Sequence, residues 1–133
     1  MNEFDLQIVT PDGLLFDGKA QKIILRTSEG DVGILAKHAD YVAALSIGVA
    51  RVFTSDGEKK AACAGGMLSV TDGVVRVVAS TFEWGEDIDV ARAEKARKKA
   101  ETKINSASDD YEHNLAEIKL KKSLARLKAS GKN

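Results

Sequence analysis

The chain has 133 residues and a formal net charge of zero, and 44% of its residues are hydrophobic. This size suits one domain, or a small domain with an appendage. The sequence contains no apolar run of the ~20 residues that a transmembrane helix needs, and its start lacks the basic segment and long apolar run of a secretory signal. The single cysteine, Cys63, excludes an internal disulfide and lies in an apolar stretch, where we expect a small buried side chain. These features predict a cytosolic setting.

The zero net charge conceals two oppositely charged halves. Residues 1–87 hold 8 Lys+Arg and 13 Asp+Glu, a formal charge of −5, whereas residues 88–133 hold 12 and 7, a charge of +5. Ten of the eleven glycines and the only proline lie in residues 1–85. The cations of the second half alternate with acids, and Tyr111 is its only aromatic residue. This pattern favours a solvated helix surface over a nucleic-acid-binding region.

The first 85 residues alternate between turn signals and short segments with the composition of strands. The predicted strands cover residues 4–8, 22–27, 34–35, 42–45, 49–54, 59–64, 67–70 and 74–79. Turns are predicted at 11–13, 17–18, 29–33, 56–57 and 72–73, and a bend or close backbone approach at 65–66. The expected fold of residues 1–85 is an antiparallel β-sandwich or flattened barrel of eight to ten strands.

No residue set in the first half argues for catalysis. Ser28, His38 and Asp40 form a triad only by selection, because no serine lies in a nucleophile-elbow glycine pattern. The two histidines, His38 and His113, fall in different halves, and no Cys/His cluster has metal-ligand spacing. The sequence therefore predicts a protein that is not an enzyme and binds no metal.

After Gly85 the sequence takes on the period of helices, and residues 86–133 predict an antiparallel two-helix hairpin. The first helix is expected to start at a cap, Asp87 or Asp89, and to run to about Asn105. Its apolar face is mostly alanine: Val90, Ala93, Ala96 (or Arg97), Ala100, Ile104 and Ala107. The second helix is expected to start at Ser108, and its predicted apolar side is Tyr111, Leu115, Ile118, Leu124 (or Ala125) and Leu127.

An alanine face has an energetic consequence for how firmly the hairpin is held. Burying a methyl group removes much less apolar area from water than burying a leucine side chain. Both helices are strong by intrinsic propensity and so persist more easily than a strand when undocked. Composition alone leaves two alternatives open: a movable helical arm on a rigid β-domain, and a permanently docked hairpin.

Three stretches of the chain resemble the epsilon subunits of bacterial F-type ATP synthases. Residues 4–13, FDLQIVTPDG, followed by LFDG at 15–18, resemble the opening hairpin of that family. EGDVGIL at 29–35 with KHA at 37–39 resembles its most recognisable loop, although Ala36 stands where the family usually has proline. EW at 83–84 with IDVARA at 88–93 resembles the nucleotide-binding signature of its bacterial members. The resemblance runs in order along essentially the whole chain.

The resemblance implies a non-catalytic subunit of the central stalk, peripheral to the cytoplasmic face of the cell membrane. Its β-domain is expected to dock on the gamma subunit and to touch the c-ring, whose proton- or sodium-driven rotation is coupled to ATP synthesis. The positions that match these contacts are Glu29, Gly30, Asp31, Gly33 and His38.

The resemblance also implies that the hairpin acts as a brake on ATP hydrolysis. Folded against the β-domain, it permits turnover; extended along the stalk, it meets the catalytic alpha and beta subunits and blocks rotation. The residues expected to contact an acidic segment of the beta subunit are Lys119, Lys121, Lys122, Arg126 and Lys128. The +5 charge of the second half agrees, since a cationic cluster needs an acidic partner.

Finally, the resemblance implies no obligatory cofactor, but ATP as a regulatory ligand of the folded hairpin. The matching residues are Glu83, Ile88, Asp89, Arg92, Ala93 and Arg126, with weaker contributions from Lys99 and Lys122, where tightly binding relatives carry arginine. Arginine grips phosphates bidentately and lysine lacks that planar fork, so weakened binding is expected. Without the resemblance, Asp89 and Arg92 are interpreted as a helix cap and an i,i+3 ion pair.

Two other functions compete with the stalk subunit. One is a stand-alone ligand-sensing β module whose basic helical arm binds an acidic protein partner. The other is a nucleic-acid factor that uses the basic arm. Copurification with a membrane rotary complex favours the stalk subunit, whereas a steep salt dependence of RNA or DNA binding favours the nucleic-acid factor.

Overall fold

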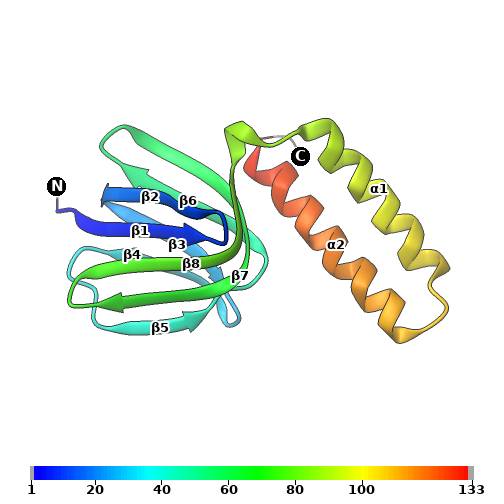
Figure 1. Ribbon diagram of the computed structural model, residues 1–133, viewed down its shortest axis with the longest axis horizontal. Coiled ribbons are helices and arrows are strands. Elements are labelled where there is room, and N and C mark those ends of the chain that lie inside the picture. The colour runs from blue at the N-terminus through cyan, green and yellow to red at the C-terminus, as the bar shows by residue number, and fades with distance from the viewer. Residues whose placement is uncertain (1, 132–133) are drawn as a thin grey trace.

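Eight β-strands followed by two helices make up the computed structural model, which describes residues 2–131 (Figure 1). The strands are β1 (Phe4–Thr10), β2 (Gly13–Ala20), β3 (Lys22–Thr27), β4 (Gly30–Leu35), β5 (Tyr41–Ala44), β6 (Gly48–Thr54), β7 (Gly57–Thr71) and β8 (Val74–Trp84). A short 3-10 turn, η1 (Gly85–Asp87), leads into α1 (Val90–Ser106) and α2 (Asp110–Ala129). The predicted β-domain with a C-terminal two-helix hairpin is confirmed.

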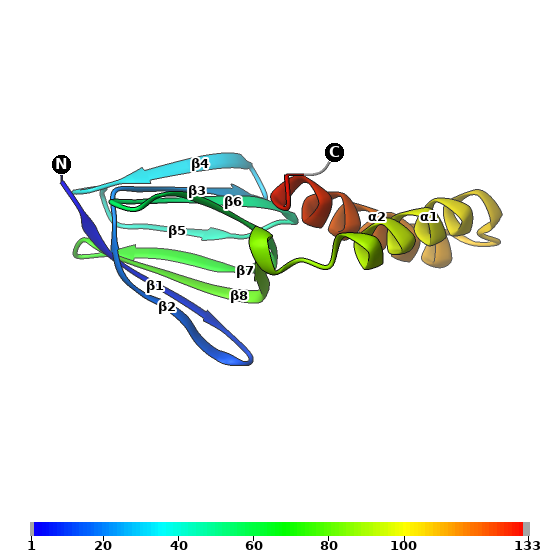
Figure 2. The same ribbon diagram turned by 90° about the horizontal axis from the view of Figure 1, so that it is seen from above.

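The strands form one sheet folded into two layers, with β3, β4 and β6 in one layer and β1, β2 and β8 in the other (Figure 2). The strand order is β2-β1-β8-β7-β6-β3-β4, and β5 pairs with β7. The two end strands do not pair with each other, so the domain is an open sandwich and not a closed barrel. One pair, β1 with β8, is parallel, because β8 takes its direction from its hairpin with β7.

The core of the sandwich lies between the layers and follows the alternation of the strands. Leu6, Ile8, Ile23 and Val77 are fully buried, and the residues between them along each strand face outward. Cys63 is also buried, as predicted, and burial raises the pKa of its thiol to about 12. The thiol is therefore protonated at neutral pH. Within residues 2–131, neither helix is long and apolar enough to cross a bilayer.

Two predicted turns are strands in the structure. Asp17 and Gly18 lie inside β2, opposite Gln7 and Leu6 of β1. Pairing with β1 along most of the strand outweighs the local turn preference of the Asp-Gly dipeptide. The predicted turn at 29–33 is shorter than expected, because the chain turns at Ser28 and Glu29 and Gly30 already begins β4.

The predicted bend at Gly65 and Gly66 is confirmed, and it divides β7 between the two layers. Both residues have positive φ values, 71° and 114°. Before the bend β7 pairs with β6, and after it with β5. A Cβ atom on Gly66 would overlap the backbone oxygen of Val78 and lie 2.8 Å from the Cα of Ala79. Glycine at this position is what allows β8 to follow β7 through the bend.

Each helix of the hairpin starts at an aspartate cap. Asp89 Oδ1 accepts a hydrogen bond from the backbone N–H of Arg92 at 3.0 Å, so of the two predicted caps Asp89 is the one used. For α2 the predicted cap, Ser108, is wrong, because Asp109 accepts from the N–H of Glu112 at 2.8 Å. Ser108 instead donates its N–H and Oγ–H to the carboxylate of Glu112. The two helices then pack antiparallel (Figure 1).

The predicted apolar side of α2 is largely wrong. Its buried residues are mostly small: Ala116, Ser123, Ala125, Leu127 and Ala129. Four of the predicted residues are exposed instead: Tyr111 by 74%, Leu115 by 40%, Ile118 by 43% and Leu124 by 47%. The contact stripe of α1 is itself alanine, so the helices approach closely and leave room only for small side chains between them. Leu127 and the alternative Ala125 are the parts of the prediction that hold.

Candidate functional site

A second apolar cluster joins the hairpin to the sandwich, separate from the sandwich core. It consists of Ala62, Ile88, Ala93, Ala125, Leu127 and Ala129, with Ile47, Val49 and Val90 packed around it. α2 lies directly on β6 and β7 here, and α1 packs on α2. Ile88 and Ala93, two of the predicted ATP-binding residues, are buried in this cluster. Their side chains therefore hold the two halves of the chain together in the docked state.

Polar residues from both halves meet at the edge of this cluster. Arg126 Nε of α2 lies 3.2 Å from Glu83 Oε1 of β8, and both side chains are about two-fifths exposed. Beside the pair is a cavity of about 60 Å³ whose lining includes Glu83, Lys122 and Arg126. An ion pair this exposed adds little stability. Its importance is positional, because it brings three predicted ATP-binding residues from two distant parts of the chain together.

The remaining predicted ATP-binding residues lie on α1. Asp89 is engaged as the N-cap, so its interpretation as a helix cap is confirmed, although its contact is to the backbone of Arg92 and not to the guanidinium. Arg92 and Lys99 are exposed and lie two helical turns apart on one face. Within residues 2–131 neither has an ion-pair partner. Both cations are therefore available to an anion.

Cations from both helices border the same side of the hairpin. A groove of about 400 Å³ at the hairpin tip is lined by Lys103 of α1 and Lys119 of α2. By helical periodicity, the other predicted cations continue from these two towards the sandwich. We call the set the basic side of the hairpin: Arg92, Lys99, Lys103, Lys119, Lys122 and Arg126. Like charges repel across the closed hairpin, and a bound polyanion would relieve that repulsion. Lys103 was missed because it matches no family signature and is recognised only by its place in the groove.

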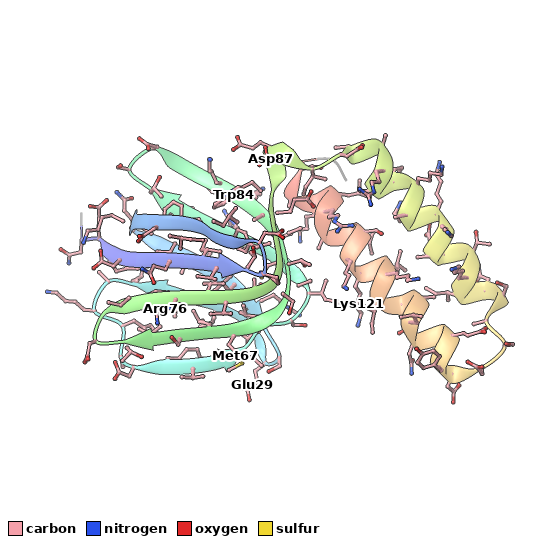
Figure 3. All side chains as sticks on the ribbon, in the orientation of Figure 1. Glu29, Met67, Arg76, Trp84, Asp87 and Lys121 are labelled. Carbon is pink, nitrogen blue, oxygen red and sulfur yellow. The ribbon has the colours of Figure 1, made fainter. Side chains whose placement is uncertain are left out.

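The five residues predicted for the inhibitory contact do not share one face of α2. Lys119, Lys122 and Arg126 belong to the basic side of the hairpin. Lys121 and Lys128 are seven residues apart on a different face, and Figure 3 shows Lys121 on the flank of α2 that is turned towards the sandwich. The inhibitory contact stays a prediction.

The residues predicted to contact the gamma subunit and the c-ring lie around β4. Glu29 is in the turn before the strand, at the lower end of the sandwich in Figure 3, and Asp31 Oδ1 is 3.4 Å from the guanidinium of Arg26. Gly30 and Gly33 lie within the strand, and His38 follows its other end, where its ring meets Tyr41 edge-on. The strand separates its ends by about 17 Å at 3.3–3.4 Å per residue. The set therefore spans two ends of the sandwich and is not one loop; its role stays a prediction.

An apolar surface on the sandwich was missed by sequence reasoning. Strand register aligns five residues across β2, β1, β8, β7 and β5, which we call the apolar row: Leu14, Val9, Val78, Met67 and Ala44. Leu14 is 59% exposed, Val78 47% and Met67 45%. The strand patterns show each residue facing outward, but only the pairing register shows that the five adjoin.

Comparison with known proteins covers both halves of the chain. Residues 3–85 match the family model for the β-sandwich domain of the ATP synthase delta/epsilon chain. Residues 86–131 match the model for the long α-helix domain of the same chain. The chain belongs to the ATP synthase delta/epsilon family. The resemblance to epsilon subunits is thereby confirmed, and the chain is a non-catalytic stalk subunit.

Individual relatives agree along nearly the full length. The ATP synthase epsilon chain of Syntrophomonas wolfei is 41% identical over 130 residues, which cover 97% of this chain and 95% of the relative. That of Ruminococcus albus is 35% identical and covers 99% of both chains. Among solved structures, a chain of the Euglena gracilis mitochondrial ATP synthase, in its OSCP/F1/c-ring assembly, matches with a TM-score of 0.83 at 28% identity, covering 96% of this chain and 81% of that one.

Proposed function

We propose that this chain is a rotor subunit that couples c-ring rotation to ATP synthesis and whose hairpin regulates ATP hydrolysis. Its partners are the gamma subunit, the c-ring and the catalytic alpha and beta subunits, at the cytoplasmic face of the membrane. Family membership supports the place in the central stalk, because the matching Euglena chain comes from an assembly that contains the catalytic head and the c-ring.

The apolar row is the proposed docking surface for the gamma subunit. Exposed apolar residues are ordinary when scattered, but a contiguous row across five strands is typical of an interaction site. The row is flanked by polar side chains, among them Arg76, whose Nε donates to Gln7 Oε1 at 3.1 Å. An apolar strip with a polar rim is the usual composition of a stable protein interface.

Regulation by the hairpin rests on one observation, the exposed apolar side chains of α2. In the docked state α2 buries mostly alanine and serine, with Leu127 the exception, whereas Tyr111, Leu115, Ile118 and Leu124 stay partly or largely exposed to water. Full burial of a leucine or isoleucine side chain contributes about 1.5–3 kcal/mol, and Leu115, Ile118 and Leu124, at 40%, 43% and 47% exposure, forgo a little under half of it. The docked state thus leaves a substantial part of the apolar surface of α2 exposed. An extended state in which a partner covers these side chains is the state that acts as a brake.

Removing the hairpin tests this proposal. A chain that ends at Asp87, incorporated into the synthase complex, is expected to raise the rate of ATP hydrolysis because no helix can extend to block rotation. Gel densitometry measures how much of the truncated chain and of the full-length chain is incorporated into the complex. Equal incorporation is the control, because it shows that the sandwich docks equally well without the hairpin. An unchanged hydrolysis rate at equal incorporation would show that the hairpin is not an inhibitor.

ATP is proposed to bind the basic side of the closed hairpin, next to Glu83. Arg92 and Arg126 would hold the phosphates, with weaker support from Lys99 and Lys122. The ion pair with Glu83 keeps Arg126 at the junction of hairpin and sandwich. Because this set of groups exists only when the hairpin is closed, ATP stabilises the docked state by about RT ln(1 + [L]/Kd). High ATP then holds the brake off.

Titration of ATP into the full chain, followed by calorimetry, tests the site. Arg92→Ala and Arg126→Ala are each expected to weaken binding about tenfold or more, the typical loss for a charge-assisted hydrogen bond. Arg97→Ala is the matched control, since Arg97 is bonded to Glu94 and Glu101 on its own helix. If the first two variants bind ATP as tightly as the wild type, the site assignment is wrong.

A further inference from the structure

Gly85 lies where the sandwich meets the C-terminal end of the hairpin. It begins η1, directly after β8, and it is buried. A Cβ atom at this position would overlap the carbonyl oxygen of Ala129, in the last turn of α2, and would lie 2.8 Å from the carbonyl carbon of that residue. Its φ lies outside the left-handed region, so its backbone conformation alone does not require glycine. Glycine is required here by the close approach of α2.

The contact is between backbones, which limits any adjustment. A long side chain that meets a new methyl group can rotate away, but the Ala129 carbonyl is part of the backbone and moves only with the end of α2. On the other side of Gly85, a Cβ would stand 3.2 Å from the carbonyl oxygen of Lys60 in β7. The added methyl group would therefore be caught between the sandwich and the hairpin, and the mobile partner of the two is the hairpin.

The docked hairpin is held near this contact and not at its tip. Leu127 and Ala129 are buried, whereas Tyr111 at the other end of α2 is exposed. Figure 1 shows the C-terminal end of α2 against the sandwich and the turn between the helices directed away from it. Trp84 adjoins the contact, because it lines a cleft of about 340 Å³ together with Gly85, Ala129 and Gly131.

We propose that Gly85 keeps the hairpin docked. Because Gly85 has no side chain, the last turn of α2 can pack directly against the sandwich. This backbone contact, which we call the latch, sets the balance between the docked and undocked states. The mobility of the hairpin is taken from the proposed function. The latch also explains how a hairpin with a mostly alanine interface remains docked, since a close backbone contact replaces the packing of large side chains.

Gly85→Ala in the full chain is the direct test. The ratio of docked to undocked hairpin is expected to fall about tenfold or more, as overpacking of a tight contact does. Trp84 is the only tryptophan, so its emission reports, without a label, a change in the cleft that it lines together with Ala129. Amide exchange should quicken in residues 125–129 and stay unchanged in β1 and β8. Gly18→Ala is the control, because its Cβ would meet only the Phe16 ring at 3.5 Å. Unchanged emission and exchange in Gly85→Ala would overturn the proposal.

A second variant separates the latch from a need of the sandwich itself. Ala125→Glu places a carboxylate in the buried contact of α2 with the sandwich and should undock the hairpin by another route. In the Ala125→Glu background, Gly85→Ala should cost no further stability, because Ala129 has already moved away from residue 85. An equal cost in both backgrounds would assign Gly85 to the sandwich and overturn the latch. If Gly85→Ala undocks the hairpin but leaves hydrolysis by the complex unchanged, the latch stands and the proposed regulation fails.

Discussion

Gly66→Ala is expected to destabilise the sandwich by about 3 kcal/mol or more, the upper range for a substitution that combines backbone strain with steric overlap. Gly66 has φ 114°, which side-chain-bearing residues rarely adopt. Its Cβ would also overlap the backbone oxygen of Val78 and approach the Cα of Ala79 to 2.8 Å. Both atoms belong to the paired strand β8, so relief requires the two strands to part. Urea unfolding of the full chain measures the loss.

Gly57→Ala is the matched control for this prediction. Gly57 has a similar φ, 118°, but nothing lies within 4 Å of the position of its Cβ. This variant should lose only the free energy that a residue with a Cβ pays to adopt a positive φ, about 1–2 kcal/mol. The difference between the two variants isolates the overlap at the bend of β7. Equal losses would mean that the bend relaxes freely and that its close packing is unimportant to the fold.

Leu127→Ala is expected to loosen the docked hairpin by about 2–5 kcal/mol, the usual cost of a leucine-to-alanine change in a packed core. Leu127 is the one large apolar side chain of α2 that is buried between hairpin and sandwich. Its loss leaves Ile88 as the one large side chain among the buried members of the cluster. The expected results are faster amide exchange in α2, altered Trp84 emission and, in the complex, stronger inhibition of hydrolysis.

Leu124→Ala is the contrasting variant, three residues away on the same helix. Leu124 is about half exposed, so its removal should destabilise the isolated chain by only about 1 kcal/mol, well below the loss at Leu127. In the complex the proposed function gives it the opposite effect, because the extended state loses one of its apolar contacts and inhibition weakens. If the two leucine variants behave alike, the division of α2 into a docking face and an inhibitory face is wrong.

Local sequence patterns predicted the elements that depend on neighbouring residues. The Asp-Gly turn at 72–73, the bend at 65–66 and the cap at Asp89 appear in the structure as predicted, and the turn predicted at 56–57 lies one residue earlier, at Ser55 and Asp56. Such features are set by φ preferences and short hydrogen bonds, which act within a few residues. The same local rule failed at Asp17 and Gly18, where pairing with a distant strand position overrode it.

The candidate site was predicted in its parts but not in its arrangement. Glu83, Lys122 and Arg126 were named from the resemblance, and the structure brings them together at one cavity. Ile88 and Ala93 were named with them, yet they are buried in the second apolar cluster, which joins the hairpin to the sandwich. The apolar row and the groove at Lys103 were missed, because each depends on how strands or helices are placed beside one another.

The sequence by itself determined which elements this protein contains: a β-domain, a change of period after Gly85, and two helices. It also determined membership of a stalk-subunit family. Tertiary structure alone decided which side of α2 is buried, which sandwich residues adjoin, and why glycine occupies position 85. The physical reason is that helix rotation and strand register are fixed by packing between distant segments. In the sequence Gly85 marked only the boundary between the β-domain and the helices, whereas in three dimensions it is the residue that the last turn of α2 approaches most closely.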